Sequence, residues 1–552
     1  MRQMSSSSSE RNKRRRVFAV SALLGALVFI LIYGPYVLNP FYDGWIFNTG
    51  ERDLIQHYVG FCAYRSSPWQ FPIGLVTTAS YPNDMSVIYT DAIPLFAFAV
   101  KMVSPLLPRV FQYLGIYGML SMSLMGGFGA LILYELTGKA GISIISSLFY
   151  ALSWTVLYRM FYHTSLTSQW LILIAIYIWI RVDYKEKPIR MILMLFFLSC
   201  IAMLIHPYIW AMCGGIVIMS LVEHMVIDRK YYRALMYGMI YCITGGAVLY
   251  AFGALSGGVG AKLDVGKYEA NLNTLYNSCG LAILPGFPTA LLQYEGFGYL
   301  GAGVLFLGIC ALLIMIIRRK LPRITFHRVM MSAAAACFII FSIVPEISLN
   351  DKILIDLKLG KVEDYIVGIF RSNGRFIWPV CFLLLTAVLV YVIRCLDGKR
   401  LLLLIIFSLI LQITDMIPFL TTRHELFSRA DYKYTGWLEE KKEIKDVIDK
   451  YDHIVMDIDD GEIDQDLTYF AYLHGMTTND FYYARPIGHK VQGTLEALRE
   501  DMKKGKYDDS LLYVLSSDSL PLYRDLELHF YEVDGRYIAS HQPIPGLDGY
   551  RK

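Results

Sequence analysis

Hydrophobic and polar positions divide the chain into a long apolar part and a shorter polar part. Up to about residue 418, apolar runs long enough to cross a bilayer alternate with polar connectors. This pattern predicts an α-helical multi-span membrane protein with about 11 transmembrane helices. The expected crossings lie at residues 17–38, 111–136, 141–158, 164–181, 188–206, 208–228, 232–256, 297–317, 326–345, 376–394 and 400–418.

The connectors between these runs predict the orientation of the chain. Residues 181–190, 228–233, 316–323 and 393–400 are rich in Lys and Arg, and they alternate with connectors that are poor in both. Basic connectors stay in the cytoplasm. We therefore expect a multi-pass protein of a bacterial cytoplasmic membrane, with a cytoplasmic N-terminus and an extracytoplasmic C-terminal domain.

One apolar run, residues 91–108, does not fit this alternation. A full crossing there would invert every later connector, and the run is short and contains Asp91, Pro94 and Lys101. We predict that it forms a re-entrant or juxtamembrane helix within the first outer loop.

Three segments follow from this pattern. Residues 1–16 are Ser-rich and basic and predict a disordered cytoplasmic tail. Residues 17–418 form the transmembrane domain, with outer loops at 39–110, 257–296 and 346–375. Residues 419–552 predict a small extracytoplasmic α/β domain, with strand-like runs at 453–458, 511–517 and 529–540 and a charged helix at 494–507.

The composition agrees with a membrane protein and narrows its partners. Of 552 residues, 55% are hydrophobic and 18% are charged, and the net charge of +4 gives no reason to expect a nucleic-acid partner. The nine cysteines lack the spacing of a metal site. Cys62 and Cys279 fall in outer loops, where either a disulfide or two thiols is compatible with the sequence.

Polar and charged residues that are unfavourable inside a bilayer are predicted to lie at one membrane face. An ionised group at mid-bilayer costs on the order of 3 kcal/mol on insertion scales, and such residues usually mark function. The stretch 49–69 holds a carboxylate, an amide and an imidazole within about one helical turn, and it follows the first crossing. The candidates at this depth are Asp53, Gln56, His57, Arg159, His163, His206, Glu295, Arg371, Arg375 and Asp415.

Each of these residues also has a structural explanation. An interfacial His is often a satisfied structural residue, an Arg often anchors lipid headgroups, Glu295 can close a loop, and Asp53 can cap a helix. Their common depth favours one functional site. Arg and His bind phosphate, and a carboxylate accepts a proton from a hydroxyl. These are the parts that an inverting glycosyl transfer from a polyprenyl-phosphate sugar needs.

Motifs over nearly the whole chain resemble a family of bacterial multi-pass membrane proteins without an assigned activity, whose layout is similar to the GT-C glycosyltransferases. The motifs are GERDLIQHYVGF, SPWQFPIG, YTDAIPLFA, YHTSL, LIHPY, QYEGFGYLG, FRSNGRFIWP and LQITD, with TTNDFYYARPI, KYDDSLLYVLSSD and VDGRYI in the tail. The resemblance implies a GT-C-like fold with functional first and second outer loops.

The resemblance also implies roles for the first-loop carboxylates. Asp53 matches the acidic position that serves as catalytic base in GT-C enzymes. Asp91 is a second first-loop carboxylate, which would position the acceptor or, with Asp53, hold a divalent metal such as Mg or Mn. The chain lacks the adjacent Asp-Glu pair of protein O-mannosyltransferases, so the acceptor class and the metal stay open.

We therefore expect a membrane glycosyltransferase that moves a sugar from a polyprenyl-phosphate donor onto a cell-envelope glycan or glycolipid. Asp53, His57 and Asp91 are the catalytic candidates. The substrate-binding candidates are Gln56, Arg159, His163, His206, Glu295, Arg371, Arg375 and Asp415. Two alternatives are a flippase for a lipid-linked glycan and a non-catalytic scaffold of envelope assembly. Against the flippase, polar residues are not strung between the leaflets and no inverted repeat is visible.

Overall fold

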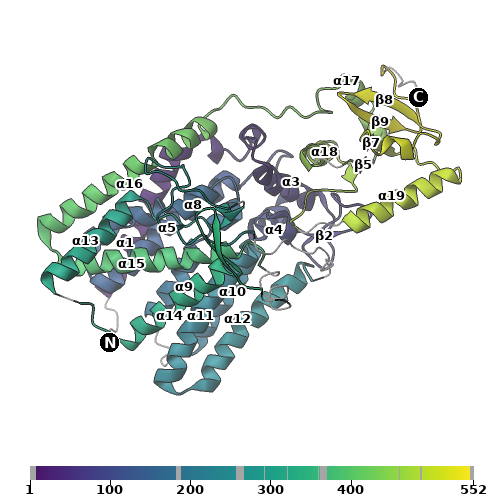
Figure 1. Ribbon diagram of the computed structural model, residues 1–552. Coiled ribbons are helices and arrows are strands. Elements are labelled where there is room, and N and C mark those ends of the chain that lie inside the picture. The colour runs from purple at the N-terminus through teal and green to yellow at the C-terminus, as the bar shows by residue number, and fades with distance from the viewer. Residues whose placement is uncertain are drawn as a thin grey trace. The chain divides into compact units, whose positions relative to one another are not determined.

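The chain folds into two compact units, drawn in Figure 1. The membrane unit contains residues 1–39, 114–245 and 262–429, and the loop–tail unit contains 40–113, 246–261 and 430–552. The first outer loop thus shares a unit with the C-terminal segment. The computed structural model describes residues 8–181, 188–255, 267–290, 292–319, 321–358, 360, 370–458, 461–484 and 488–547.

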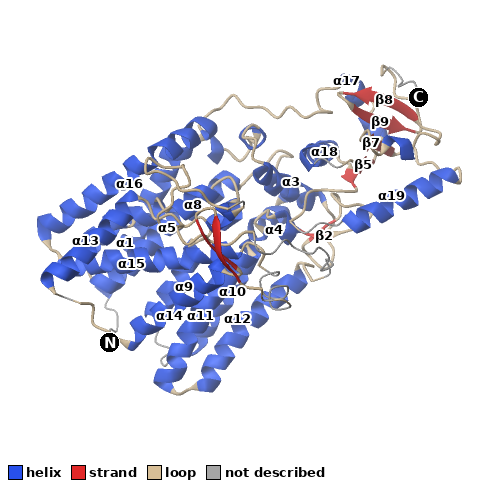
Figure 2. Ribbon diagram, viewed as in Figure 1, coloured by secondary structure: helices blue, strands red, loops and turns tan. Residues whose placement is uncertain are grey.

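Helices dominate the membrane unit, as Figure 2 shows in blue. Within the described residues, ten helical segments are long and apolar enough to cross a membrane, and one apolar helix, α13, is shorter. This confirms a mostly helical, multi-span protein. The segment Ala140–Arg159 is divided into three consecutive helices, α6 to α8. The helices are α1 (Ser8–Tyr33), α5 (Leu114–Thr137), α6 (Ala140–Ser146), α7 (Leu148–Ala151), α8 (Trp154–Arg159), α9 (Trp170–Arg181), α10 (Pro188–Ile205), α11 (Pro207–Asp228), α12 (Tyr231–Ala251), α13 (Ala302–Arg318), α14 (Phe326–Ile343), α15 (Trp378–Cys395) and α16 (Gly398–Phe427).

Glycines allow α1 and α5 to pack closely. A Cβ at Gly25 would collide with the carbonyl oxygen of Met122, and a Cβ at Gly126 would collide with that of Ser21. Small residues at helix crossings let membrane helices approach without a hydrophobic driving force. The first helix is therefore held along α5 by backbone contact.

One end of the membrane unit, here called the basic end, carries several arginines. Arg14 of α1 pairs with Glu135 near the end of α5, and Arg394 near the end of α15 donates to the carbonyl of Leu136. Helix α15 has 18 residues and is about 27 Å long at 1.5 Å per residue. Its first turn therefore lies about one hydrocarbon thickness from the basic end.

The loop–tail unit contains a five-stranded mixed sheet, red in Figure 2, in the order β6-β5-β7-β9-β8. Strand β5 pairs in parallel with β6 and β7, and β9 pairs antiparallel with β7 and β8. This confirms a sheet domain in the C-terminal segment. The elements of the unit are α2 (Gly44–Phe47), α3 (Arg52–Ser66), β1 (Leu75–Val76), β2 (Met85–Ser86), α4 (Pro94–Met102), α17 (Lys442–Lys445), β5 (His453–Asp457), α18 (Gly461–His474), β6 (Thr477–Thr478), α19 (Gly488–Lys503), β7 (Leu511–Leu515), β8 (His529–Val533) and β9 (Arg536–Ser540).

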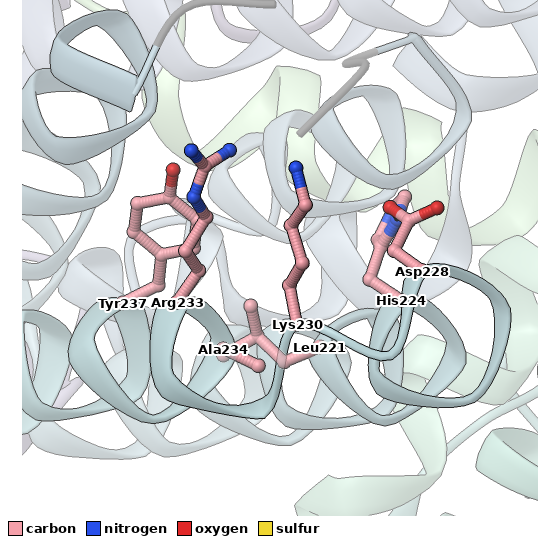
Figure 3. A pocket seen from close by; sticks show the side chains of 7 residues that line it. All are labelled: Leu221, His224, Asp228, Lys230, Arg233, Ala234 and Tyr237. Atoms are coloured by element: carbon pink, nitrogen blue, oxygen red, sulfur yellow. The ribbon is translucent and has the colours of Figure 1, made fainter. Parts of the chain in front are cut away.

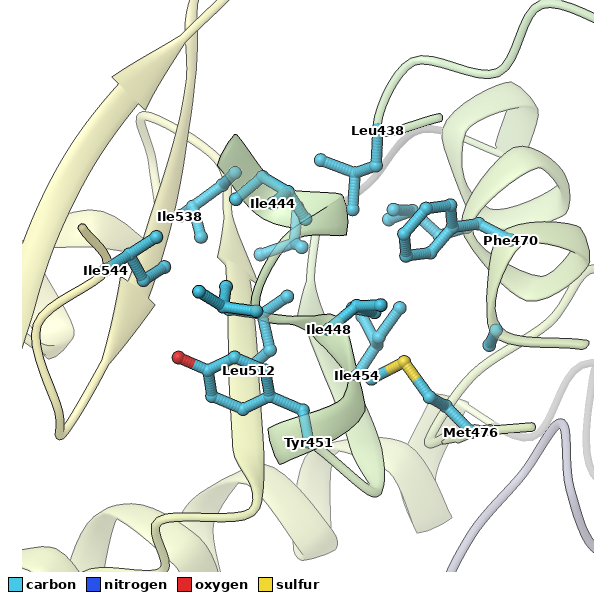
Figure 4. Packing of buried hydrophobic residues seen from close by; sticks show 14 of the residues in the cluster. Leu438, Ile444, Ile448, Tyr451, Ile454, Phe470, Met476, Leu512, Ile538 and Ile544 are labelled. Atoms are coloured by element: carbon cyan, nitrogen blue, oxygen red, sulfur yellow. The ribbon is translucent and has the colours of Figure 1, made fainter. Parts of the chain in front are cut away.

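The sheet packs its own hydrophobic core, shown in Figure 4. Ile454 of β5, Leu512 of β7 and Ile538 of β9 are buried together with Phe470 of α18. Their burial removes apolar surface from water at roughly 25 cal/mol per Å². This core stabilises the C-terminal part of the unit and holds α18 in place.

The first outer loop pairs with this domain through its backbone. The amide of Thr478 donates to the carbonyl of Thr78 at 2.8 Å, and the amide of Tyr81 donates to the carbonyl of Thr478 at 2.7 Å. The amide of Ala484 donates to the carbonyl of Tyr89 at 2.8 Å. The loop and the C-terminal domain, which the sequence analysis treats as separate regions, form one folded body.

The end of α12 belongs to the same body. The carbonyl of Ala251 accepts from the amide of Ile73 at 2.8 Å, and the carbonyl of Phe252 accepts from the hydroxyl of Ser86 at 2.7 Å. Within the described residues, six candidate spans lie between residue 113 and this point, and three long ones and the shorter α13 lie between it and residue 430.

Two short regions with their own sequence predictions, residues 91–108 and the N-terminal tail, both contain helix in the structure. Helix α4 has nine residues and is about 14 Å long, which is too short to cross a bilayer alone, and the re-entrant or juxtamembrane placement of 91–108 stays a prediction. The tail predicted to be disordered is helical from Ser8 onward because it continues α1. Residues 1–7, 256–266, 291, 359 and 361–369, parts of the predicted tail and outer loops, lie outside the described residues. Cys62 and Cys279 are both free thiols.

Candidate functional site

The carboxylate of Glu295 lies at the centre of a buried charge cluster in the membrane unit. Glu295 stands in a short 3₁₀ turn, Gln293–Gly296, before α13. Its Oε2 accepts from Nη2 of Arg159 at 2.7 Å and from Nε of Arg375 at 2.8 Å. Nε2 of His163 lies 4.0 Å from its Oε1. We call these four residues the cation cluster.

The cation cluster has an excess of positive charge. Burial raises the pKa of Glu295, but the charges of Arg159 and Arg375 and the hydrogen bond from Arg375 outweigh burial and hold that pKa well below its usual range. One ionised carboxylate therefore faces two guanidinium groups. Arg159 is fully buried, and its Nε and Nη1 have no hydrogen-bond partner among the described residues. Buried donors of this kind suit an anion with several acceptor oxygens.

Aromatic side chains hold the two arginines in place. The guanidinium of Arg375 lies 4.8 Å from the ring centre of Tyr208, and that of Arg159 lies 5.6 Å from the ring of Trp378. The hydroxyl of Tyr208 accepts from the amide of Ser372 at 2.8 Å. Stacking and hydrogen bonding together orient both planar groups toward Glu295.

Asp415, predicted to contact substrate, organises the second outer loop. Its Oδ1 accepts from the amide of Leu284 at 3.0 Å. Its Oδ2 accepts from the hydroxyl of Tyr299 at 2.8 Å and from the amide of Ala302, the first residue of α13, at 3.1 Å. These bonds satisfy a helix N-terminus, and the predicted substrate contact of Asp415 stays a prediction.

His206 and Arg371, two further predicted phosphate contacts, are not members of the cation cluster. His206 is the N-cap of α11, where its Nδ1 accepts from the amide of Tyr208 at 3.1 Å. Arg371 is exposed, and its guanidinium lies 5.0 Å from the ring of Tyr268. A structural role therefore accounts for the observed contacts of both residues, and their predicted phosphate contacts stay predictions.

Helix α3 carries the first-loop candidates. Asp53, Gln56 and His57 are separated by three and four positions and share one side of the helix. The N-cap of α3 is Glu51, so Asp53 does not cap the helix; it lies in the first turn, where a carboxylate is favoured by the helix dipole. Gln56 is buried, and its Nε2 has no hydrogen-bond partner among the described residues.

His57 lies beside Asp91. A ring nitrogen of His57 and a carboxylate oxygen of Asp91 are within 4.8 Å of each other. Asp91 has a φ of 54° and Ile93 a φ of 53°, and this region is a strained one for a β-branched residue. Such strain is often kept at functional positions. An imidazole with a carboxylate suits Mn²⁺ better than Mg²⁺, which prefers oxygen ligands.

A family model described as "Domain of unknown function (DUF6311)" matches residues 22–417, and the "DUF6311 C-terminal domain" model matches residues 443–541. The chain belongs to this family. Among curated proteins, none matches. Among solved structures, the chain is similar to the apo form of the Archaeoglobus fulgidus oligosaccharyltransferase, with 11% identity and a TM-score of 0.43. The alignment covers 98% of this chain and 76% of that one. Values this low do not transfer an activity.

This DUF6311 protein also contains polar groups that sequence reasoning missed. Asp43 accepts from the hydroxyl of Tyr58 at 3.0 Å and from the hydroxyl of Tyr469 on α18. Burial raises the pKa of Asp43, and the two tyrosine hydrogen bonds only partly offset this. The partner Tyr469 comes from the far end of the chain, so no local motif signals the contact. Tyr208 was missed for a different reason: an aromatic residue beside a turn is common and does not by itself indicate a site.

Proposed function

We propose that this protein is a membrane glycosyltransferase of the bacterial cell envelope. It would move a sugar from a polyprenyl-phosphate donor onto an envelope glycan or glycolipid at the extracytoplasmic face of the cytoplasmic membrane. The observation that carries the proposal is the cation cluster. Two buried arginines share one carboxylate, and two nitrogens of Arg159 have no hydrogen-bond partner within the part of the chain that the structure describes.

The cation cluster supplies the phosphate-binding part. In glycosyl transfer the lipid phosphate is the leaving group, and its negative charge grows as the bond to the sugar breaks. Fixed guanidinium groups in a low-dielectric site stabilise such charge without reorganisation. Glu295 holds Arg159 and Arg375 in place, and His163 adds a third donor when it is protonated.

The first outer loop supplies the acid–base part. A carboxylate, Asp53 or Asp91, accepts the proton of the acceptor hydroxyl. The hydroxyl oxygen then bonds to the anomeric carbon while the bond between that carbon and the phosphate oxygen breaks. Where a divalent metal is bound, His57 and Asp91 would hold it. The amide of Gln56 offers a buried donor for a sugar hydroxyl.

Mass spectrometry of envelope glycans from cells with and without the gene tests the proposal. Loss of one sugar from one glycan is expected without the gene. Plasmid-borne Asp53→Asn, Asp91→Asn and Arg159→Gln variants should fail to restore it at normal protein level. Asp449→Asn, at an exposed position of the C-terminal domain, should restore it fully. Unchanged glycans in the deletion would instead favour a flippase or a scaffold.

A further inference from the structure

A large groove lies at the basic end of the membrane unit. It has a volume of about 590 Å³ and is lined by residues of α5, α9, α14 and α15 and by the segment before α14. Ligand sites are roughly 300–1,000 Å³. Its walls are mostly apolar, with Ile176, Met331, Ala335, Leu384 and Ala387 among the lining residues.

Three arginines line this groove, and none of the residues that line it is acidic. They are Arg323, Arg328 and Arg394. Arg328 and Arg394 are near enough for their charges to interact. The neighbouring acid, Glu223, is occupied, because it pairs with His327 at 2.9 Å and accepts from the indole of Trp179. The groove therefore combines an apolar interior with a net positive border.

The groove is distinct from the cation cluster. Arg394 is next to last in α15 and donates to Leu136 near the end of α5, whereas Arg375 precedes the first turn of α15. The length of α15 separates the two places by about 27 Å. A ligand of the groove would thus reside in the opposite leaflet from the proposed reaction.

We propose that this groove binds one anionic glycerophospholipid of the leaflet at the basic end. An acyl chain lies between α14 and α15, and the headgroup phosphate contacts Arg323, Arg328 and Arg394. Arginine pairs with phosphate through charge-assisted hydrogen bonds, and basic pockets between transmembrane helices select anionic headgroups. Charge complementarity identifies the occupant, since none of the residues that line the groove is acidic and a neutral lipid brings no net counter-charge.

A second basic pocket at the turn between α11 and α12 provides a matched control. Figure 3 shows Lys230 and Arg233 there, with Asp228 beside His224 at 3.4 Å. This pocket has a volume of only about 20 Å³, which is room for water but not for an acyl chain. Removing its two positive charges changes the surface charge as much as removing Arg323 and Arg328 does.

The test uses the full-length protein in phosphatidylcholine nanodiscs that contain a small fraction of phosphatidylglycerol with a photoactivatable acyl chain. Cross-linked peptides are identified by mass spectrometry, and the expected peptides come from α14 and α15. The Arg323→Gln/Arg328→Gln variant should lower this cross-linking roughly tenfold. The Lys230→Gln/Arg233→Gln variant should leave it unchanged.

A variant of the groove wall tests the acyl-chain part separately. Ala387 is exposed on α15 and lines the groove. Ala387→Trp should abolish the α14 and α15 cross-links while the unfolding temperature is retained. Equal cross-linking by photoactivatable phosphatidylcholine would overturn the proposal. So would an equal loss in the two double variants, because general attraction to the surface would then explain the binding.

Discussion

The Nε of Arg375 donates to Oε2 of Glu295 at 2.8 Å, although 80 residues separate the two in the sequence. Each comes from a loop that precedes a membrane helix, α15 and α13 respectively. Arg159 donates to the same oxygen at 2.7 Å. One carboxylate thus ties three distant segments of the membrane unit together, and this gives the cation cluster a role in stability as well as in function.

Replacing Glu295 should destabilise the membrane unit strongly. Glu295→Gln removes the carboxylate that the two buried guanidinium groups share, which costs about 3–5 kcal/mol. Thermal unfolding of the purified protein in detergent measures the loss. Glu425→Gln is the control because Glu425 is exposed on α16. Equal stability of the two variants would contradict the structural role.

The contribution of Glu295 should depend on pH in a defined way. Its folded-state pKa lies below the ordinary value of 4.5, so the folded protein binds fewer protons there than the unfolded chain. The stabilisation is complete above pH 4.5 and is lost as the pH falls through the folded pKa. The stability difference between wild type and Glu295→Gln should therefore be constant at neutral pH and shrink below 4.5. A difference that instead changed around neutral pH would contradict the ionised Glu295 as its cause.

The contribution of Asp43 to stability should depend on pH with the opposite sign to that of Glu295. Its folded pKa is raised by burial above the ordinary 3.8, so its contribution to stability is complete below pH 3.8 and is lost as the pH rises through the folded pKa. Asp43→Asn keeps an acceptor for Tyr58 and Tyr469 without the buried charge. We expect it to stabilise the loop–tail unit at neutral pH, because the buried charge is removed. Hydrogen exchange in α18 measures this, and a faster exchange than in wild type would contradict it.

Lys101 should be another site where charge removal stabilises. Its ammonium is buried, lies 4.1 Å from the ring of Tyr64 and 4.7 Å from that of Trp69, and has no hydrogen-bond partner among the described residues. Burial lowers the pKa of Lys101 to about 8. Lys101→Met should stabilise the protein by roughly 1–3 kcal/mol at neutral pH. Wild type should gain stability between pH 8 and the ordinary value of 10.5, whereas the variant should not. Identical pH profiles of unfolding would exclude a buried charge.

We expect Mn²⁺ to bind to the first loop through His57 and Asp91. Mn²⁺ should then raise the unfolding temperature of wild type, because a ligand that binds only the folded state stabilises it. His57→Ala and Asp91→Asn should each abolish this shift, and Asp449→Asn should retain it. The same Mn²⁺ shift in all four proteins would place any metal elsewhere.

Much of the membrane architecture was predictable because hydrophobic period and length have few interpretations. The apolar runs match the helices, and nine residues in α4 agree with a run that does not cross. The strands of the C-terminal segment were predicted less accurately. The run 529–540 predicts one strand, but Asp534 and Gly535, with φ of 51° and 77°, turn it into the hairpin β8–β9. An Asp-Gly pair is a strong hairpin signal.

The candidate site was predictable only where depth in the membrane was informative. Arg159, His163, Glu295 and Arg375 share a depth, and the structure joins them. Depth alone does not separate a ligand contact from a helix cap, so the bonds of Asp415 to the N-terminus of α13 and the cap made by His206 were not predicted. The pairing of Asp43 with Tyr469 was out of reach, because it depends on a tertiary contact between the two ends of the chain.

The loop–tail unit has a consequence for biosynthesis. Residues 40–113 leave the ribosome long before residues 430–552, and the chain between them takes roughly 15–60 s to synthesise at 5–20 residues per second. Throughout that interval the first loop has no β6 backbone to pair with. Folding of this body therefore has to wait until residues 430–552 have been synthesised, and a nascent chain halted before residue 430 exposes the loop to proteases and chaperones.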